Sequence, residues 1–113
     1  MWERVGIVRD GTGLKHALQE IAGLQSRSKN LRVPGGCVFN LTWQQALDMR
    51  NMLTCSELIA HGALIREESR GAHYREDFPK PDDSNWLKNI YFSRNGLAPR
   101  LWAEPVNLKT LKP

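Results

Sequence analysis

The longest helical pattern in the chain is residues 42–65, TWQQALDMRNMLTCSELIAHGALI. Thr42 and Gln45 have the spacing of a capping box, in which two side chains satisfy free backbone donors at a helix start. Gly71 and Pro79 limit the helix on its far side. A helix of about 25 residues is long for a globular protein, so this segment is predicted to be the central element of a helical bundle.

Two strips of small or apolar residues run along this predicted helix. The first comprises positions 46, 49, 53, 56, 60 and 63, and the second comprises positions 47, 54, 58 and 65. Both strips need cover from other elements. Since the chain offers only one other convincing amphipathic helix, the second strip must be covered by the short N-terminal segment, by C-terminal strands or by a partner outside this sequence. We infer that the chain is either a piece of a larger protein or an obligate assembly partner.

A second helix is predicted to begin after Asp10, because Asp10-Gly-Thr-Gly13 supplies turn and N-cap chemistry. Its apolar residues at positions 14, 17, 18, 21 and 24 share one helical face. Residues 1–9, MWERVGIVR, precede it as a short helical turn or an extended lead-in.

A loop is predicted before the long helical pattern, and a hairpin is predicted after it. Residues 31–40, LRVPGGCVFN, contain Pro-Gly-Gly and cannot continue a helix. Residues 86–92, WLKNIYF, and 101–106, LWAEPV, are predicted to pair around the Asn95-Gly96 turn signal.

The distribution of charge argues against nucleic-acid binding. The formal charge is +4, but residues 66–83 hold six acidic and four basic residues, and the surplus lies in residues 84–113. A phosphate-binding groove would need clustered cations with aromatic residues and few acids. Scattered solubilising charge is therefore the better interpretation, and nucleic acid ranks last among the partners considered.

Cysteine spacing and hydropathy argue against a structural zinc site and against direct membrane insertion. Cys37 and Cys55 show no Cys-x-x-Cys spacing, which argues against structural zinc. Cys55 is predicted to be a free, buried thiol in a reducing compartment. The start lacks the order of a signal peptide, and no apolar run approaches eighteen residues, so direct membrane insertion is not expected.

Residues 66–79, REESRGAHYREDFP, are the densest cluster of chemically active groups. His73 between Arg70 and Arg75 is an acid/base candidate. The same groups suit a structural clasp, because arginine forks bind carboxylates through two hydrogen bonds, and acids stand at 67, 68, 76 and 77. The residues alone favour the clasp and leave the catalytic site open.

A cofactor motif is not found. Gly11-Thr-Gly13 is the nearest string to a dinucleotide-binding fingerprint, but His16 stands where the third glycine belongs. The turn-and-cap interpretation is preferred.

Three stretches carry a family resemblance: MWERVGIVRDGTGLKHAL, the run from Ala46 to Ile90, and the later AEPV. Together they resemble the C-terminal helical domain of succinate dehydrogenase and fumarate reductase flavoprotein subunits, over roughly residues 1–108. The most specific part is 68–79, followed by Asp82-Asp83 and Trp86. L-aspartate oxidase and adenylylsulfate reductase have related domains, but Asp-Asp-x-x-Trp is more similar to the succinate/fumarate branch.

The resemblance implies a fold and a boundary. The fold is mainly α: an antiparallel three-helix bundle resembling a spectrin repeat in residues 1–68, then the charged motif with an extended tail or short β-hairpin in residues 69–113. No catalytic, cofactor or metal residue is assigned to this chain. The resemblance implies a structural motif at the seam with a preceding flavin-binding domain, made of Arg66, Glu68, Ser69, Arg70, Gly71, His73, Arg75 and Asp77.

It also implies the parent's activity. The parent would interconvert succinate and fumarate through FAD and pass electrons to an iron-sulfur subunit, while this chain alone would not catalyse. It would be cytoplasmic and near a membrane only through the parent complex. The alternatives are a stand-alone helical protein-interaction module and the C-terminal domain of a related flavoprotein.

Overall fold

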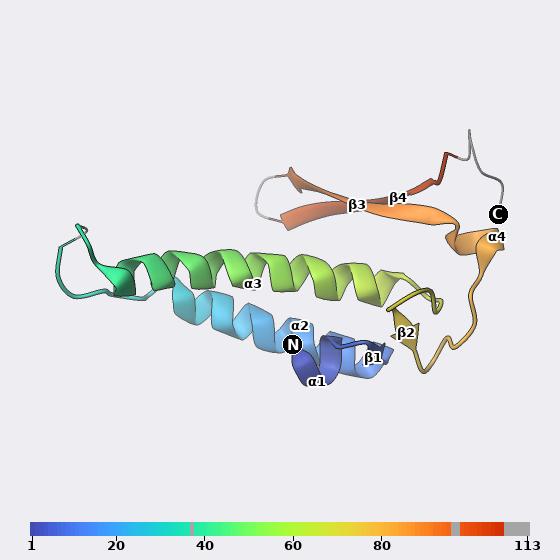
Figure 1. The fold of residues 1–113 in the computed structure, drawn as a ribbon, viewed down its shortest axis with the longest axis horizontal. Helices are drawn as coiled ribbons and strands as arrows, with labels where there is room; N and C mark the ends of the chain where they lie inside the picture. The colour runs from blue at the N-terminus through green and yellow to red at the C-terminus, as the bar shows by residue number, and fades with distance from the viewer. Residues whose placement is uncertain (37, 96–97, 108–113) are drawn as a thin grey trace.

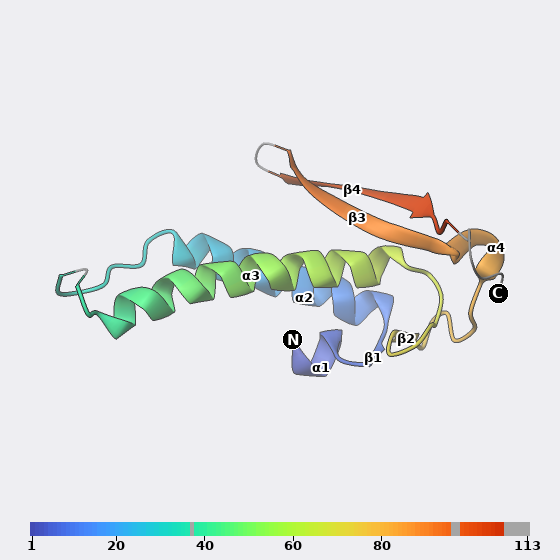
Figure 2. The same ribbon diagram turned by 45° about the horizontal axis from the view of Figure 1, so that its top comes forward.

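In this computed structural model, which describes residues 1–36, 38–95 and 98–107, the chain forms an elongated molecule of 56 × 32 × 24 Å. Two long antiparallel helices run along its length, and a β-hairpin lies alongside one of them (Figures 1 and 2). Short elements gather at the end where the charged motif lies. The helices are α1 (Trp2–Val5), α2 (Gly11–Ser28), α3 (Leu41–Ile65) and α4 (Asp83–Trp86). The strands are β1 (Val8–Arg9), β2 (Tyr74–Arg75), β3 (Lys88–Asn95) and β4 (Ala98–Pro105).

Helix α2 begins as predicted. The side chain of Asp10 accepts hydrogen bonds from the backbone N–H groups of Thr12 (2.8 Å) and Gly13 (2.9 Å). This satisfies two of the free donors at the helix start and confirms the N-cap. Residues 1–9 form both a helical turn and an extended segment, α1 and β1.

The capping box predicted at Thr42 and Gln45 is wrong, because α3 begins at Leu41 with Asn40, two residues before Thr42, as its cap. The Asn40 side-chain oxygen accepts from the N–H of Trp43 at 3.1 Å. Its amide nitrogen also donates to the carbonyls of Pro34 (3.0 Å) and Gly36 (2.9 Å). Asn40 therefore starts the helix and holds the preceding loop at the same time.

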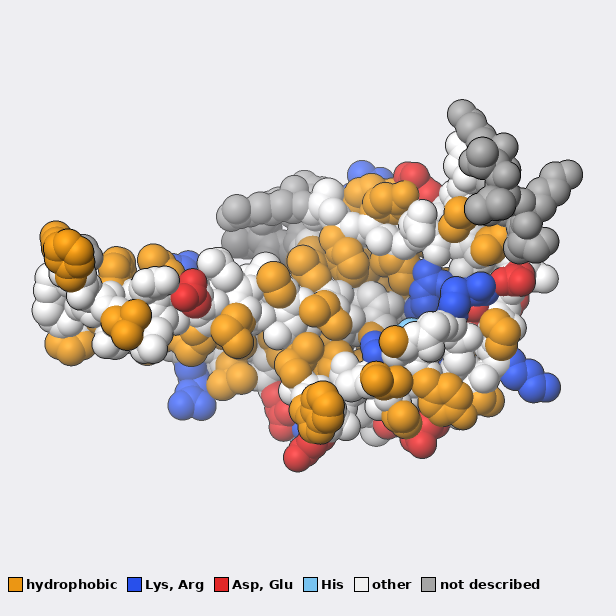
Figure 3. All heavy atoms as spheres, in the orientation of Figure 1, with side chains coloured by type: hydrophobic (Ala, Val, Ile, Leu, Met, Phe, Trp, Pro, Cys, Tyr) orange, Lys and Arg blue, Asp and Glu red, His pale blue; other side chains and the backbone are white. Residues whose placement is uncertain are grey.

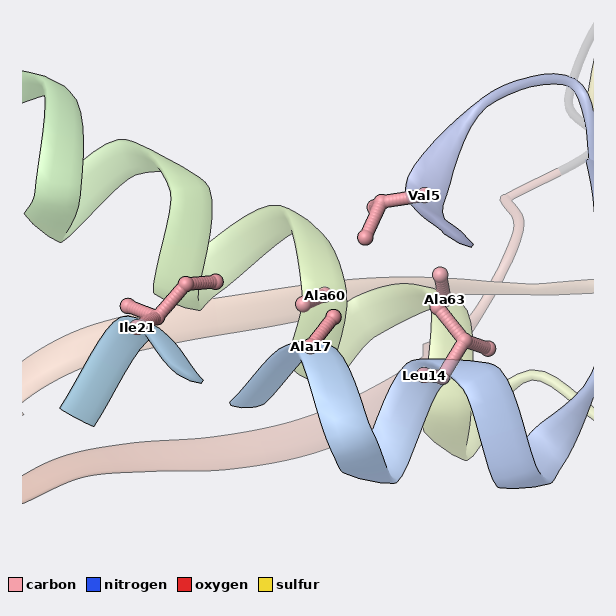
Figure 4. Close-up of a cluster of buried hydrophobic side chains, with 6 residues drawn as sticks. All are labelled: Val5, Leu14, Ala17, Ile21, Ala60 and Ala63. Atoms are coloured by element: carbon pink, nitrogen blue, oxygen red, sulfur yellow. The ribbon is translucent and has the colours of Figure 1, made fainter. Parts of the chain in front are cut away.

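The core joins the two long helices to α1 (Figure 4). Its buried residues are Val5 from α1, Leu14, Ala17 and Ile21 from α2, and Ala60 and Ala63 from α3. The alanines let the helix backbones approach closely, as expected from small residues at a helix contact. Of the six positions in the first predicted strip, only 60 and 63 are thus fully buried.

The second strip stays largely uncovered. Leu47 and Ile65 expose 44% and 40% of their surface. Cys55, on α3, is also exposed, so the prediction of a buried thiol is wrong. Cys37 lies outside the described residues.

The C-terminal hairpin is confirmed. β3 and β4 pair antiparallel, with a register from Lys88↔Pro105 to Asn95↔Ala98. Gly96 of the predicted turn lies outside the described residues. The hairpin lies on α3 at Gly62, where an added Cβ would meet the Phe92 ring at 3.3 Å.

Helices make up about half of the chain, but the predicted antiparallel three-helix bundle is not confirmed. Among the described residues only α2 and α3 are long, and α1, a single turn, contacts both. The hairpin flanks α3 instead of a third long helix (Figure 2). Within the same residues, no helix combines the length and the apolarity needed to cross a bilayer.

Candidate functional site

Arg75 is almost completely buried, with 2% of its surface exposed, at the C-terminal end of α3. The last carbonyls of a helix have no partner within the helix and need another donor. The Nη1 atom of Arg75 supplies it, donating to the carbonyls of Ala63 (2.9 Å), Leu64 (3.0 Å) and Arg66 (3.1 Å). A side chain from β2 therefore caps α3.

The remaining nitrogens of Arg75 bind Asp77. Nε and Nη2 donate to the two carboxylate oxygens, each at 2.7 Å, in the two-bond geometry that the guanidinium plane favours. Asp77 Oδ2 also accepts from the backbone N–H of Gly11 at 3.0 Å, the first residue of α2. A Cβ at Gly11 would lie 3.0 Å from Oδ2, so glycine permits this approach.

The Arg75–Asp77 pair connects one end of each long helix, and each side chain carries the charge opposite to that of the helix end it contacts. The cation lies at the negative C-terminal end of α3, and the anion lies at the positive N-terminal end of α2. The hydrogen bonds from Arg75 lower the pKa of Asp77 to about 2. Arg75 and Asp77 thus form an ionised link between two helix ends.

Beside the Arg75–Asp77 pair, the site has a second charged cluster around Glu68, which is completely buried. Arg70 donates to both its carboxylate oxygens at 3.1 Å, Arg66 donates to Oε1, and the backbone N–H of Asp82 donates to Oε2 at 2.8 Å. Burial alone would raise the pKa of Glu68, but these donors outweigh it and lower the pKa to about 2. A buried carboxylate with this many donors is a structural anion.

The arginines around Glu68 extend to the C-terminal segment. Arg66 donates to the carbonyls of Trp86 (3.0 Å) and Lys88 (2.6 Å), and its guanidinium lies 5.5 Å from the centre of the Trp86 ring. Arg70 also pairs with Asp83. The Glu68 cluster therefore fixes the start of the hairpin relative to the end of α3.

Ser69 and Gly71 shape the turn between the Glu68 cluster and the Arg75–Asp77 pair. Ser69 Oγ accepts from the N–H of Arg75 (2.9 Å) and donates to the carbonyl of Phe78 (2.8 Å). Gly71 has φ = +58°, a left-handed conformation that suits glycine, so the chain reverses here and returns as β2.

His73 is half-buried and bonds to the end of α3. Its Nε2 lies 3.2 Å from the carbonyl of Arg66, to which it donates. Burial lowers the pKa of His73, and the positive charges of Arg9 and Arg75 lower it further. The imidazole is therefore neutral near pH 7 and serves as a hydrogen-bond donor to the end of α3.

The structure brings all eight predicted motif residues into one continuous region. Of the four acids suggested as arginine partners, two bind an arginine in the structure. Glu68 and Asp77 bind arginines, whereas Glu67 and Glu76 are exposed. Sequence reasoning missed Asp83 and the helix-start N–H of Gly11, since both come from distant positions. It also missed Arg9, which donates to the carbonyl of Ala72 at 3.4 Å.

The glycine pair at the start of α2 does not fit a dinucleotide. A pyrophosphate at a helix N-terminus needs free backbone N–H groups. Here the N–H groups of Gly11, Thr12 and Gly13 are already taken by Asp77 and Asp10. Residues 1–36, 38–95 and 98–107 also contain no group of three metal-binding side chains placed to share an ion.

Comparison with known proteins gives consistent matches. The model of the family described as "Fumarate reductase flavoprotein C-term" matches residues 1–113. The fumarate reductase flavoprotein of Helicobacter pylori is 44% identical over 94 residues, which are 82% of this chain and 13% of that protein. Chloroplastic L-aspartate oxidase of Oryza sativa subsp. japonica is 38% identical over 92 residues, 81% of this chain and 14% of that protein.

A solved structure agrees with these matches over the whole chain. A FrdA variant of E. coli quinol fumarate reductase superposes with a TM-score of 0.92 and 34% identity, covering 100% of this chain and 20% of that one. The chain therefore spans about a fifth or less of the proteins that it matches.

Proposed function

The chain belongs to the family of fumarate reductase flavoprotein C-terminal domains, and from this premise we propose that it is a non-catalytic structural domain whose charged motif fastens the domain to the rest of its parent. One observation supports the non-catalytic role most strongly. The charged groups of the motif are used by internal partners: Arg75 and Asp77 bind helix ends, and Glu68 binds two arginines. Acid/base catalysis needs a titrating group free to meet a substrate, and buried Glu68 and Arg75 are not such groups.

For the parent, we propose an FAD-dependent oxidoreductase that interconverts succinate and fumarate. Its flavin would lie in the part outside this chain, since the relatives are five or more times longer. FAD would supply hydride chemistry there. We further propose that the parent passes its electrons to an iron-sulfur subunit. Its position would be cytoplasmic, close to a membrane only through the complex.

The three-helix arrangement is proposed for the parent. α1 is one turn long, yet it contacts both α2 and α3 and buries Val5 in the shared core. Residues preceding α1 in the parent would extend it along the two long helices and cover part of the apolar surface that they leave exposed. This would complete an antiparallel bundle.

The experiment uses the complete flavoprotein that contains this domain. Arg70→Ala, His73→Ala and Arg75→Ala should lower its melting temperature or its flavin retention. Arg50→Ala, an exposed position on α3, is the matched control and should change neither. Normal folding and flavin content combined with a large loss of rate in the motif variants would instead assign the motif to catalysis.

A second candidate parent is an L-aspartate oxidase, favoured by the match to the Oryza sativa enzyme. The domain's role would be the same and only the substrate would differ. Succinate and L-aspartate oxidation, assayed side by side on the complete flavoprotein, separates the two parents.

A further inference from the structure

We draw no further inference here: the strongest candidate, the apolar tip of the loop between α2 and α3, where Val38 and Phe39 expose most of their surface at the end of the molecule opposite the charged motif (Figure 3), carries none, because nothing in the structure shows what covers it.

Discussion

At the scale of single residues, Arg75 carries the largest share of the connections in the motif. Arg75→Ala would remove the guanidinium that donates to the Asp77 carboxylate and to three helix-end carbonyls. Asp77 keeps contact with water, so the main cost comes from the buried helix-end carbonyls that lose a donor, typically about 1–3 kcal/mol. We expect a loss of this size in the free energy of unfolding, measured by urea denaturation. Arg50→Ala should stay within about 0.5 kcal/mol, and equal losses in the two variants would contradict the assignment.

Because Glu68 is ionised in the folded chain, we expect the folding stability to fall in acid. Its pKa falls from an ordinary value of 4.5 to about 2 in the folded chain. A carboxylate with a depressed folded pKa adds stability above its unfolded pKa and loses it as the pH falls toward the folded value. The wild-type urea midpoint should therefore drop between pH 5 and pH 2, and Glu68→Gln should flatten part of that drop. An unchanged slope in the variant would show that Glu68 is not the ionised centre.

At the scale of elements, the cap of α3 can be tested by comparing Asn40, which the structure shows, with Thr42, which was predicted. Asn40 makes the cap bond and anchors the loop, whereas Thr42 is exposed inside the first turn. Asn40→Ala should cost about 1 kcal/mol of unfolding free energy, and Thr42→Ala should cost much less. Thermal unfolding of both variants checks this. A larger loss for Thr42→Ala would restore the capping box.

The contact between α3 and the hairpin is tested by two helical glycines. Replacing a glycine in a helix by alanine usually stabilises it by about 0.5–1 kcal/mol. Gly23 on α2 has open space around it, so Gly23→Ala should show this gain. Gly62→Ala should gain less or lose stability, because its Cβ would meet the Phe92 ring at 3.3 Å. Equal gains in melting temperature would mean that the hairpin does not pack here.

At the scale of the whole molecule, the sequence predicted what depends on local signals. The N-cap at Asp10, the helices, the hairpin and the family resemblance were all confirmed, because each depends on residues close together in the chain or on a long specific match. The existence of a charged cluster was equally visible from composition.

The pairing inside the cluster was not predictable. Which acids bind arginines depends on the chain reversal at Gly71, and the bond from Gly11 to Asp77 joins positions 66 residues apart. The exposure of Cys55 likewise depends on which side of α3 meets α2. The three-helix expectation came from the resemblance, and in the described part of this chain the third helix of the core, α1, is a single turn.

If this chain is a structural domain with no flavin chemistry of its own, an FAD titration of the 113-residue chain should find no binding. We expect no saturable change in flavin absorbance or fluorescence, because the N–H groups at the start of α2 are already bound. A stoichiometric yellow complex that survives gel filtration would contradict it.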